Sequence, residues 1–223
     1  RVGHRLAMAG EVDGLVTAPG NKAALHAAGE RAEGQTQLLS RWAGVEHTGM
    51  LVVVESLRVL LLTRHMALAE AIASIDPDQV VLHLELLDRS LRGLGFPAPR
   101  LALAGLNPHA GEGGLFGSEE SRLLEPAVER ARELGLDVVG PVAPDSVFVA
   151  ARAGRHDGVL ALYHDQAFIP LKLLSQDRGV TILAGLPYLR VSPVHGTAFD
   201  IAGRGMASSE NLVHALCSAA RWV

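Results

Sequence analysis

The segment RLALAGLNPHAGEGGLFGSEESRLLEPAVERARELG, residues 100–135, decides the fold class. Its apolar beginning predicts a buried strand over 100–106, and its end has the spacing of an amphipathic helix over 118–135. Ser118 begins that helix and two glutamates occupy its first turn, where carboxylates suit the helix dipole. A strand, a glycine-rich loop and a helix in this order indicate one repeat of an α/β fold.

Short apolar strands and longer helical patterns alternate along most of the remaining chain. The predicted strands cover 13–18, 49–55, 57–63, 136–140, 157–163 and 179–185, and the predicted helices cover 21–29, 76–95 and 208–222. The strands at 49–55 and 57–63 are joined by a short turn, so we expect them to be antiparallel. We therefore predict an α/β fold with α/β/α layers around a mixed, mostly parallel sheet.

Bulk composition limits the class of protein. The chain has 223 residues, 48% of them hydrophobic, with a net charge of −4 and a single cysteine, Cys217. The sequence has no block of basic residues, so nucleic acid is not an expected partner, and no apolar run is long enough to span a membrane. One cysteine excludes an internal disulfide and favours a reducing compartment. We expect a soluble, cytoplasmic protein.

Three histidines follow predicted strands. His65 comes after LRVLLLTR, His109 lies in the glycine-rich loop after 100–106, and His164 ends DGVLALYH. Imidazoles from equivalent strand ends can converge at one edge of a sheet and hold a divalent cation such as Zn²⁺. Each is alternatively an ordinary surface or capping histidine, and the loop around His109, with Asn107 and Glu112, is alternatively a turn without a ligand.

Two further groups of residues suggest ligand contacts. Lys172, Arg190 and Thr36 together suit an anion such as phosphate, with Thr36 able to cap a helix, although each alone reads as an ordinary charge or cap. The stretch VHGTAFDIAGRG, 194–205, combines small residues with Asp200 and suits the adenosine half of a nucleotide, which is a weak pattern by itself.

Several motifs together resemble one enzyme family. They are GLVTAPGNKAALHAAG, LRVLLLTRHMAL, GLNPHAGEGGLFGSEE, GPVAPDSVF, VLALYHDQAFIPLK and GLPYLRVSPVHGTAFDIAGRG. They are similar to the 4-hydroxythreonine-4-phosphate dehydrogenases of vitamin B6 biosynthesis, and the similarity covers nearly the whole chain. The last motif also resembles the NAD-binding stretch of the wider isocitrate and isopropylmalate dehydrogenase superfamily.

This resemblance implies a two-lobed subunit, a homodimer whose active site is shared by both subunits, and a phosphorylated small-molecule substrate. The implied reaction oxidises a secondary alcohol with NAD⁺ and a divalent metal (Zn, Mg, Mn or Co), and the resulting β-keto acid loses CO₂. Motif by motif, it assigns metal ligation to His65, His109 and His164, substrate contacts to Gln35, Thr36, Lys172, Thr181 and Arg190, and NAD contacts to His195, Gly196, Thr197, Ala198 and Asp200. Lys172, as proton donor or charge partner, and Asp165, as partner of a ligand histidine, are the catalytic candidates.

The chain departs from the family pattern in the substrate pocket. The family's GHTE is GQTQ at 34–37, so Gln35 replaces a substrate-contacting histidine, and GVNIT is GVTIL at 179–183, so Thr181 replaces an asparagine. Because the three histidines are retained, we hypothesise an altered substrate, with D-threonate or D-erythronate 4-phosphate as the alternatives to 4-hydroxythreonine 4-phosphate.

The resemblance also bears on domain organisation. Family members carry roughly a hundred further amino-terminal residues with a GDPAGIGPE-like stretch, so we expect residues 1–223 to be a truncated two-lobed unit, with lobes near 13–105 and 106–223. Two other classes stay open: a non-catalytic, phosphate-ligand-binding remnant, and a three-histidine metal hydrolase or lyase that does not use NAD.

Overall fold

The computed structural model describes residues 1–32, 34–175 and 178–223. The chain packs as two compact units, residues 1–48 with 176–223 and residues 49–175. These units differ from the predicted lobes, 13–105 and 106–223, because a strand near the start of the chain pairs with one near its end. That pair is β1 (Gly14–Val16) and β8 (Leu189–Pro193), which are parallel.

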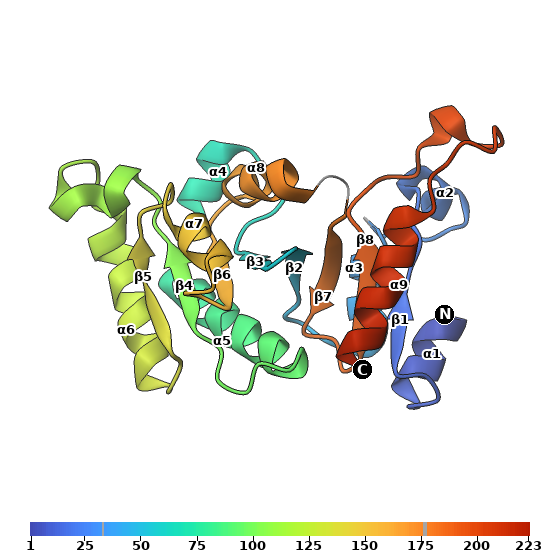
Figure 1. The fold of residues 1–223 in the computed structure, drawn as a ribbon, viewed down its shortest axis with the longest axis horizontal. Coiled ribbons are helices and arrows are strands. Elements are labelled where there is room, and N and C mark those ends of the chain that lie inside the picture. The colour runs from blue at the N-terminus through green and yellow to red at the C-terminus, as the bar shows by residue number, and fades with distance from the viewer. Residues whose placement is uncertain (33, 176–177) are drawn as a thin grey trace. The chain divides into compact units, whose positions relative to one another are not determined.

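The unit of residues 49–175 is built on five adjacent strands (Figure 1). The first pair is antiparallel and the other neighbours are parallel, as the sequence predicts. In spatial order the strands are β2 (Gly49–Val54), β3 (Leu57–Leu61), β6 (Gly158–Ala161), β4 (Leu101–Ala104) and β5 (Val138–Val142). The residues of β2, β3, β4 and β6 are almost all apolar and buried, which suits strands covered on both faces, whereas β5 is buried only at Val138.

Helices cover these strands. The longest, α5, begins at an Asp76 cap whose carboxylate accepts hydrogen bonds from the amides of Asp78 and Gln79, and it packs against α6 and the sheet. The helical segments are α4 (Leu68–Ala73), α5 (Pro77–Gly93), the 3₁₀ segment η1 (Pro108–Gly114), the π segment η2 (Glu120–Leu124), α6 (Glu125–Glu133), α7 (Val147–Arg152) and α8 (His164–Ser175). Within the described ranges, no helix is long and apolar enough to cross a bilayer.

The strands of the other unit pair around β8. Here β8 pairs in parallel with β1 and antiparallel with β7 (Val180–Ala184), and α9 (Glu210–Trp222) packs against all three strands. No strand was predicted at 189–193, a segment that has only five residues and ends in Ser-Pro. The remaining segments are α1 (Val2–Met8), α2 (Lys22–Ala27), α3 (Gln35–Ala43) and the 3₁₀ segment η3 (Phe199–Ile201).

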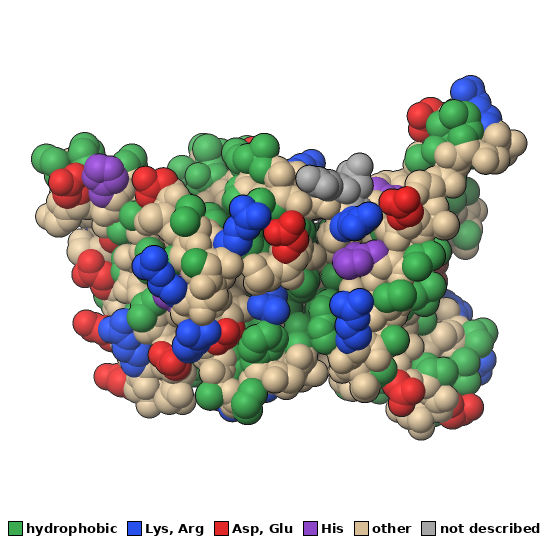
Figure 2. Space-filling model, in the orientation of Figure 1, with side chains coloured by type: hydrophobic (Ala, Val, Ile, Leu, Met, Phe, Trp, Pro, Cys, Tyr) green, Lys and Arg blue, Asp and Glu red, His purple; other side chains and the backbone are tan. Residues whose placement is uncertain are grey.

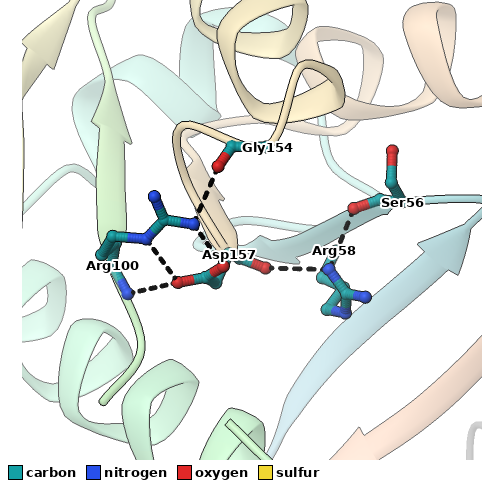
Figure 3. A network of polar contacts seen from close by, with 5 residues as sticks. All are labelled: Ser56, Arg58, Arg100, Gly154 and Asp157. Atoms are coloured by element: carbon teal, nitrogen blue, oxygen red, sulfur yellow. Dashed lines mark hydrogen bonds and ion pairs between the residues drawn. The ribbon is translucent and has the colours of Figure 1, made fainter.

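A polar network joins the amino-terminal ends of β3, β4 and β6 (Figure 3). The Asp157 carboxylate accepts hydrogen bonds from the Arg100 amide at 2.8 Å, from Nε at 3.0 Å and from Nη2 at 2.9 Å. Arg58 Nη1 donates to the Ser56 carbonyl at 3.0 Å and to the Asp157 carbonyl at 3.4 Å. The network ties together the first residues of three neighbouring strands.

Asp157→Asn should destabilise the protein by about 1–3 kcal/mol, the usual range for hydrogen bonds to a charged group. Hydrogen bonds from Arg100 lower the pKa of Asp157 below its ordinary value of 3.8, and partial burial opposes them. The stabilisation is therefore complete above the ordinary pKa and disappears as the pH falls through the lowered one. Urea unfolding of both proteins near neutral pH and in acid measures this.

Asp78→Asn is the matched control. Asp78 also pairs with an arginine, Arg130, at 2.6 Å, but its side chain is 76% exposed, whereas that of Asp157 is 15% exposed. Exposed pairs contribute about 0–1 kcal/mol. Equal losses in the two variants, or a loss in Asp157→Asn that persists unchanged in acid, would contradict the assignment.

Candidate functional site

His65 and His164 lie together at the carboxyl edge of the sheet in the unit 49–175. They follow β3 and β6, which are adjacent and parallel, and their ring centroids are 5.0 Å apart. Thr63 links the two strand ends, because its hydroxyl donates to the Leu162 carbonyl at 2.7 Å and its amide donates to the same oxygen at 3.3 Å. The sequence reasoning predicted the two histidines here and missed Thr63.

The His164 ring is held in one orientation. It begins α8, stacks on Phe168 with centroids 4.4 Å apart, and its Nδ1 lies 2.7 Å from Oδ1 of Asp165. An ionised carboxylate only accepts, so Nδ1–H donates to it, and Nε2 is the ring nitrogen left for a ligand. A metal-ligating histidine usually has such a carboxylate partner. The donor set of this pair therefore fits a divalent metal such as Zn²⁺.

Gln166 also lies at this edge of the sheet, and it was not predicted from the sequence. Its side chain is 7% exposed, its Oε1 accepts from the Leu162 amide at 2.7 Å, and its Nε2 donates to the Gly105 carbonyl at 2.7 Å. It therefore ties the end of β6 to the end of β4. The signal was available, since a polar residue two positions after a strand-end histidine in YHDQ has no packing reason to be there.

His109 does not join the other two histidines within the chain. Its side chain is 65% exposed, and its Nδ1–H donates to the Glu112 carboxylate at 3.0 Å. Among the residues the structure describes, no three His, Cys, Asp or Glu side chains gather closely enough to hold one metal ion. The residue-based expectation that all three histidines meet at one edge is therefore met by two of them. The loop after β4 runs away from the strand end and places His109 at the surface.

Lys172 lies two turns along α8 from His164, as the sequence predicts. Phe168 stands between them, with Lys172 Nζ 6.0 Å from its ring centroid and the His164 ring stacked on it. The three residues are spaced at four-residue intervals, so they share one face of the helix. The ammonium is exposed and available to a ligand.

Arg190 is the unusual cation of the other unit. It is 6% exposed, and its Nη2 donates to Thr17 Oγ1 at 2.7 Å and to Gln35 Oε1 at 3.1 Å. Its buried Nε has no hydrogen-bond partner among the described residues, and no carboxylate among them forms an ion pair with it. Burial lowers the pKa of Arg190 to about 10, and the nearby Tyr188 opposes this. A buried guanidinium without a counter-ion is costly, and an anionic ligand removes that cost.

Three further predicted substrate residues belong to the same unit. Gln35 begins α3 and its Nε2 donates to the Ala18 carbonyl at 3.1 Å. Thr36 lies in the first turn, but the N-cap is Gly34, so the interpretation of Thr36 as a cap is wrong. Thr181 pairs with Ser192 across β7 and β8, which places it on the same face of the ladder as Arg190.

The predicted NAD segment follows the carboxyl end of β8. His195 Nδ1 lies 2.9 Å from the Gly196 carbonyl, and Ala198 has a left-handed φ of 47° before η3. His195, Gly196, Ala198 and Asp200 are exposed and Thr197 is half-buried. A loop at the carboxyl end of a parallel strand pair is the usual ligand position in α/β folds.

Comparison with known proteins identifies relatives. A family profile described as "Pyridoxal phosphate biosynthetic protein PdxA" matches residues 1–219. A 4-hydroxythreonine-4-phosphate dehydrogenase of Beijerinckia indica subsp. indica is 48% identical over 216 residues, which cover 97% of this chain and 64% of the relative. A D-threonate 4-phosphate dehydrogenase of Pectobacterium atrosepticum is 47% identical over 207 residues, 93% of this chain and 64% of the relative.

The fold of this chain also matches that of a solved structure. The crystal structure of a 4-hydroxythreonine-4-phosphate dehydrogenase from Klebsiella pneumoniae matches with a TM-score of 0.94 and 44% identity, covering 98% of this chain and 66% of that chain. The chain thus spans about two thirds of that structure and 64% of each of the two curated relatives.

Proposed function

The chain belongs to the PdxA family of pyridoxal phosphate biosynthetic proteins, and we propose on this basis that it acts as an NAD- and divalent-metal-dependent dehydrogenase. The proposed reaction oxidises 4-hydroxythreonine 4-phosphate at its secondary alcohol and decarboxylates it to 3-amino-2-oxopropyl phosphate. The observation that carries the proposal is the His65–His164 pair, with its rings 5.0 Å apart.

His65 and His164 are the proposed metal ligands of this unit. When bound, the metal supplies Lewis acidity at the substrate hydroxyl and NAD⁺ accepts the hydride. Asp165 accepts from Nδ1–H of His164 and so orients the ring with Nε2 free to coordinate the metal. Phe168 excludes water from one side of the imidazole, and Lys172, on the same helix face, supplies a positive charge or a proton to the substrate.

His109 is the proposed third ligand, contributed by a second copy of the chain. Its imidazole is exposed and lies apart from the pair in its own chain. Leu115 and Phe116, 71% and 45% exposed, stand in the same loop, and Figure 2 shows hydrophobic, acidic and histidine side chains together at the surface over this segment. An apolar surface beside a ligand residue suits a homodimer with a shared site.

Arg190, with Thr36 and Thr181, is the proposed binding group for the anionic part of the substrate, and the loop 195–200 is the proposed NAD contact. The burial of Arg190 supports this assignment, because its guanidinium is a buried cation with which none of the described carboxylates forms an ion pair. Gln35 occupies one of its N–H groups with a neutral amide. Because this amide stands where the family pattern has a histidine, D-threonate or D-erythronate 4-phosphate is the second candidate substrate.

Steady-state NADH formation tests the proposed function. The protein, supplied with NAD⁺ and Zn²⁺, Mn²⁺, Co²⁺ or Mg²⁺, should oxidise one of these 4-phosphates with kcat/KM of at least about 10⁴ M⁻¹s⁻¹, the lower end of the usual range for enzymes. The ratio of kcat/KM for the two substrate types decides between them. Tight binding of substrate without any NADH would favour a non-catalytic binding protein, and turnover without NAD⁺ would favour a metal hydrolase or lyase.

A further inference from the structure

The loop that carries His109 has an unusual backbone. Residues 109–113 all have left-handed φ values, 53°, 54°, 80°, 43° and 65°, although His109, Ala110 and Glu112 are not glycines. Left-handed conformations cost roughly 1 kcal/mol for each such residue, so a run of this kind persists only where surrounding contacts impose it.

Glu120 holds the backbone just before this run. This carboxylate is 3% exposed, although carboxylates are seldom fully buried without partners. Its Oε1 accepts from the amides of Leu106 and Asn107 at 2.9 and 2.7 Å, and its Oε2 accepts from Asn107 Nδ2 at 2.8 Å. Its carboxylate thus holds the residues at which the chain leaves β4 and enters the left-handed turn.

Gly111 brings the turn itself onto the same carboxylate. A Cβ at this position would lie 2.9 Å from Glu120 Oε2, so only glycine allows the approach. Gly113 lies two residues further on, has a φ of 65°, and a Cβ there would meet open space. The two glycines therefore share the backbone strain of the turn and differ in contact with Glu120.

We propose that Glu120 is a positioning residue that aims His109 at the metal, by clamping both the entry and the middle of the left-handed turn. The proposal rests on the proposed function, since it assumes that His109 is a metal ligand. Glu120 touches neither His109 nor the metal position, and it acts through the backbone of 106–111. A clamped turn holds the imidazole ready for the second copy of the chain, and a loosened turn must be ordered at the moment of binding.

Metal affinity of the intact protein tests this, by titration with Co²⁺ or Zn²⁺ alone. Glu120→Gln should weaken binding about 10–100-fold, the usual effect of removing a supporting contact of a ligand. Glu119→Gln is the matched control, because Glu119 accepts from Asn107 Nδ2 and from the backbone of 118 and 119, whereas Glu120 holds the amides of 106 and 107. If Glu120→Gln does not fold, a second pair of variants, Gly111→Ala and Gly113→Ala, tests the proposal instead. Only Gly111→Ala should weaken metal binding strongly.

Two readouts separate aiming from general stability. Thermal stability should fall in both Gly111→Ala and Gly113→Ala, because both place a Cβ on a left-handed residue, and further in Gly111→Ala, whose Cβ also meets Glu120. Amide exchange at 106 and 107 should accelerate only in Glu120→Gln and Gly111→Ala. Unchanged metal affinity in Glu120→Gln or Gly111→Ala, when His109→Ala has lost it, would overturn the inference alone. Unchanged affinity in His109→Ala itself would instead show that the metal assignment of His109, and hence the proposed function of the loop, is wrong.

Discussion

Replacing His164 with alanine should lower kcat/KM about 10³-fold while the protein stays folded. Loss of a ligand removes Lewis-acid stabilisation worth several kcal/mol, and each 1.4 kcal/mol is tenfold in rate. His164 is 29% exposed on its side chain and lies at the edge of the sheet, so its loss leaves the core intact. Steady-state kinetics with saturating metal measures the effect, and a chelator should bring the unmodified protein to a similar level.

His83→Ala is the control, because it removes an imidazole from α5 of the same unit, bonded to the Gln79 carbonyl rather than placed at the sheet edge. It should retain near-normal turnover. Equal losses of kcat/KM in His164→Ala and His83→Ala, or a chelator without effect on the unmodified protein, would show that the reaction does not use a metal at this site.

Mixing His164→Ala with His109→Ala extends this result to the dimer. If each site combines His65 and His164 of one chain with His109 of another, a mixed dimer has one intact site of two. Random exchange of subunits should then recover about a quarter of normal activity from two inactive proteins. No recovery in a mixture shown to exchange subunits would mean that one chain supplies all the ligands.

Replacing Arg190 with methionine should raise KM about 100-fold or more. Truncating one partner of a buried charge pair usually costs about 2–5 kcal/mol, and the anionic part of the substrate is the only proposed counter-ion. Arg190→Lys should recover part of the loss, since it keeps the charge but not the fork that reaches both Thr17 and Gln35. Arg5→Met, an exposed cation on α1, should leave KM unchanged.

The pH dependence gives Arg190 a separate signature. Burial lowers its pKa in the fold to about 10, below its ordinary value, so the unfolded chain binds more protons above about pH 10 and stability should rise with pH there. Below about pH 10 the unpaired charge lowers stability in full, and inorganic phosphate should raise the melting temperature. A phosphate effect of equal size in Arg190→Met would place the anion elsewhere.

The sequence predicted the α/β class, the antiparallel β2–β3 pair and the strand-end placement of His65 and His164, because hydrophobic periodicity and strand ends are local properties. It did not predict that β1 pairs with β8, since this pairing joins residues 175 positions apart, such as Gly14 and Leu189. The Thr17–Arg190 hydrogen bond likewise joins residues 173 positions apart. Thr63, Gln166 and Glu120 were missed for a related reason. Their roles depend on which backbone atoms the fold brings beside them.

The division of the chain also fixes an order of events during synthesis. Residues 49–175 are continuous and hold five adjacent strands, so they can fold as soon as they have left the ribosome. Strand β1 emerges earlier but has only three residues, and its partner β8 is made last among the strands. We therefore expect β1 to stay unpaired, and accessible to chaperones, until β8 has been made, after residues 49–175 have become native.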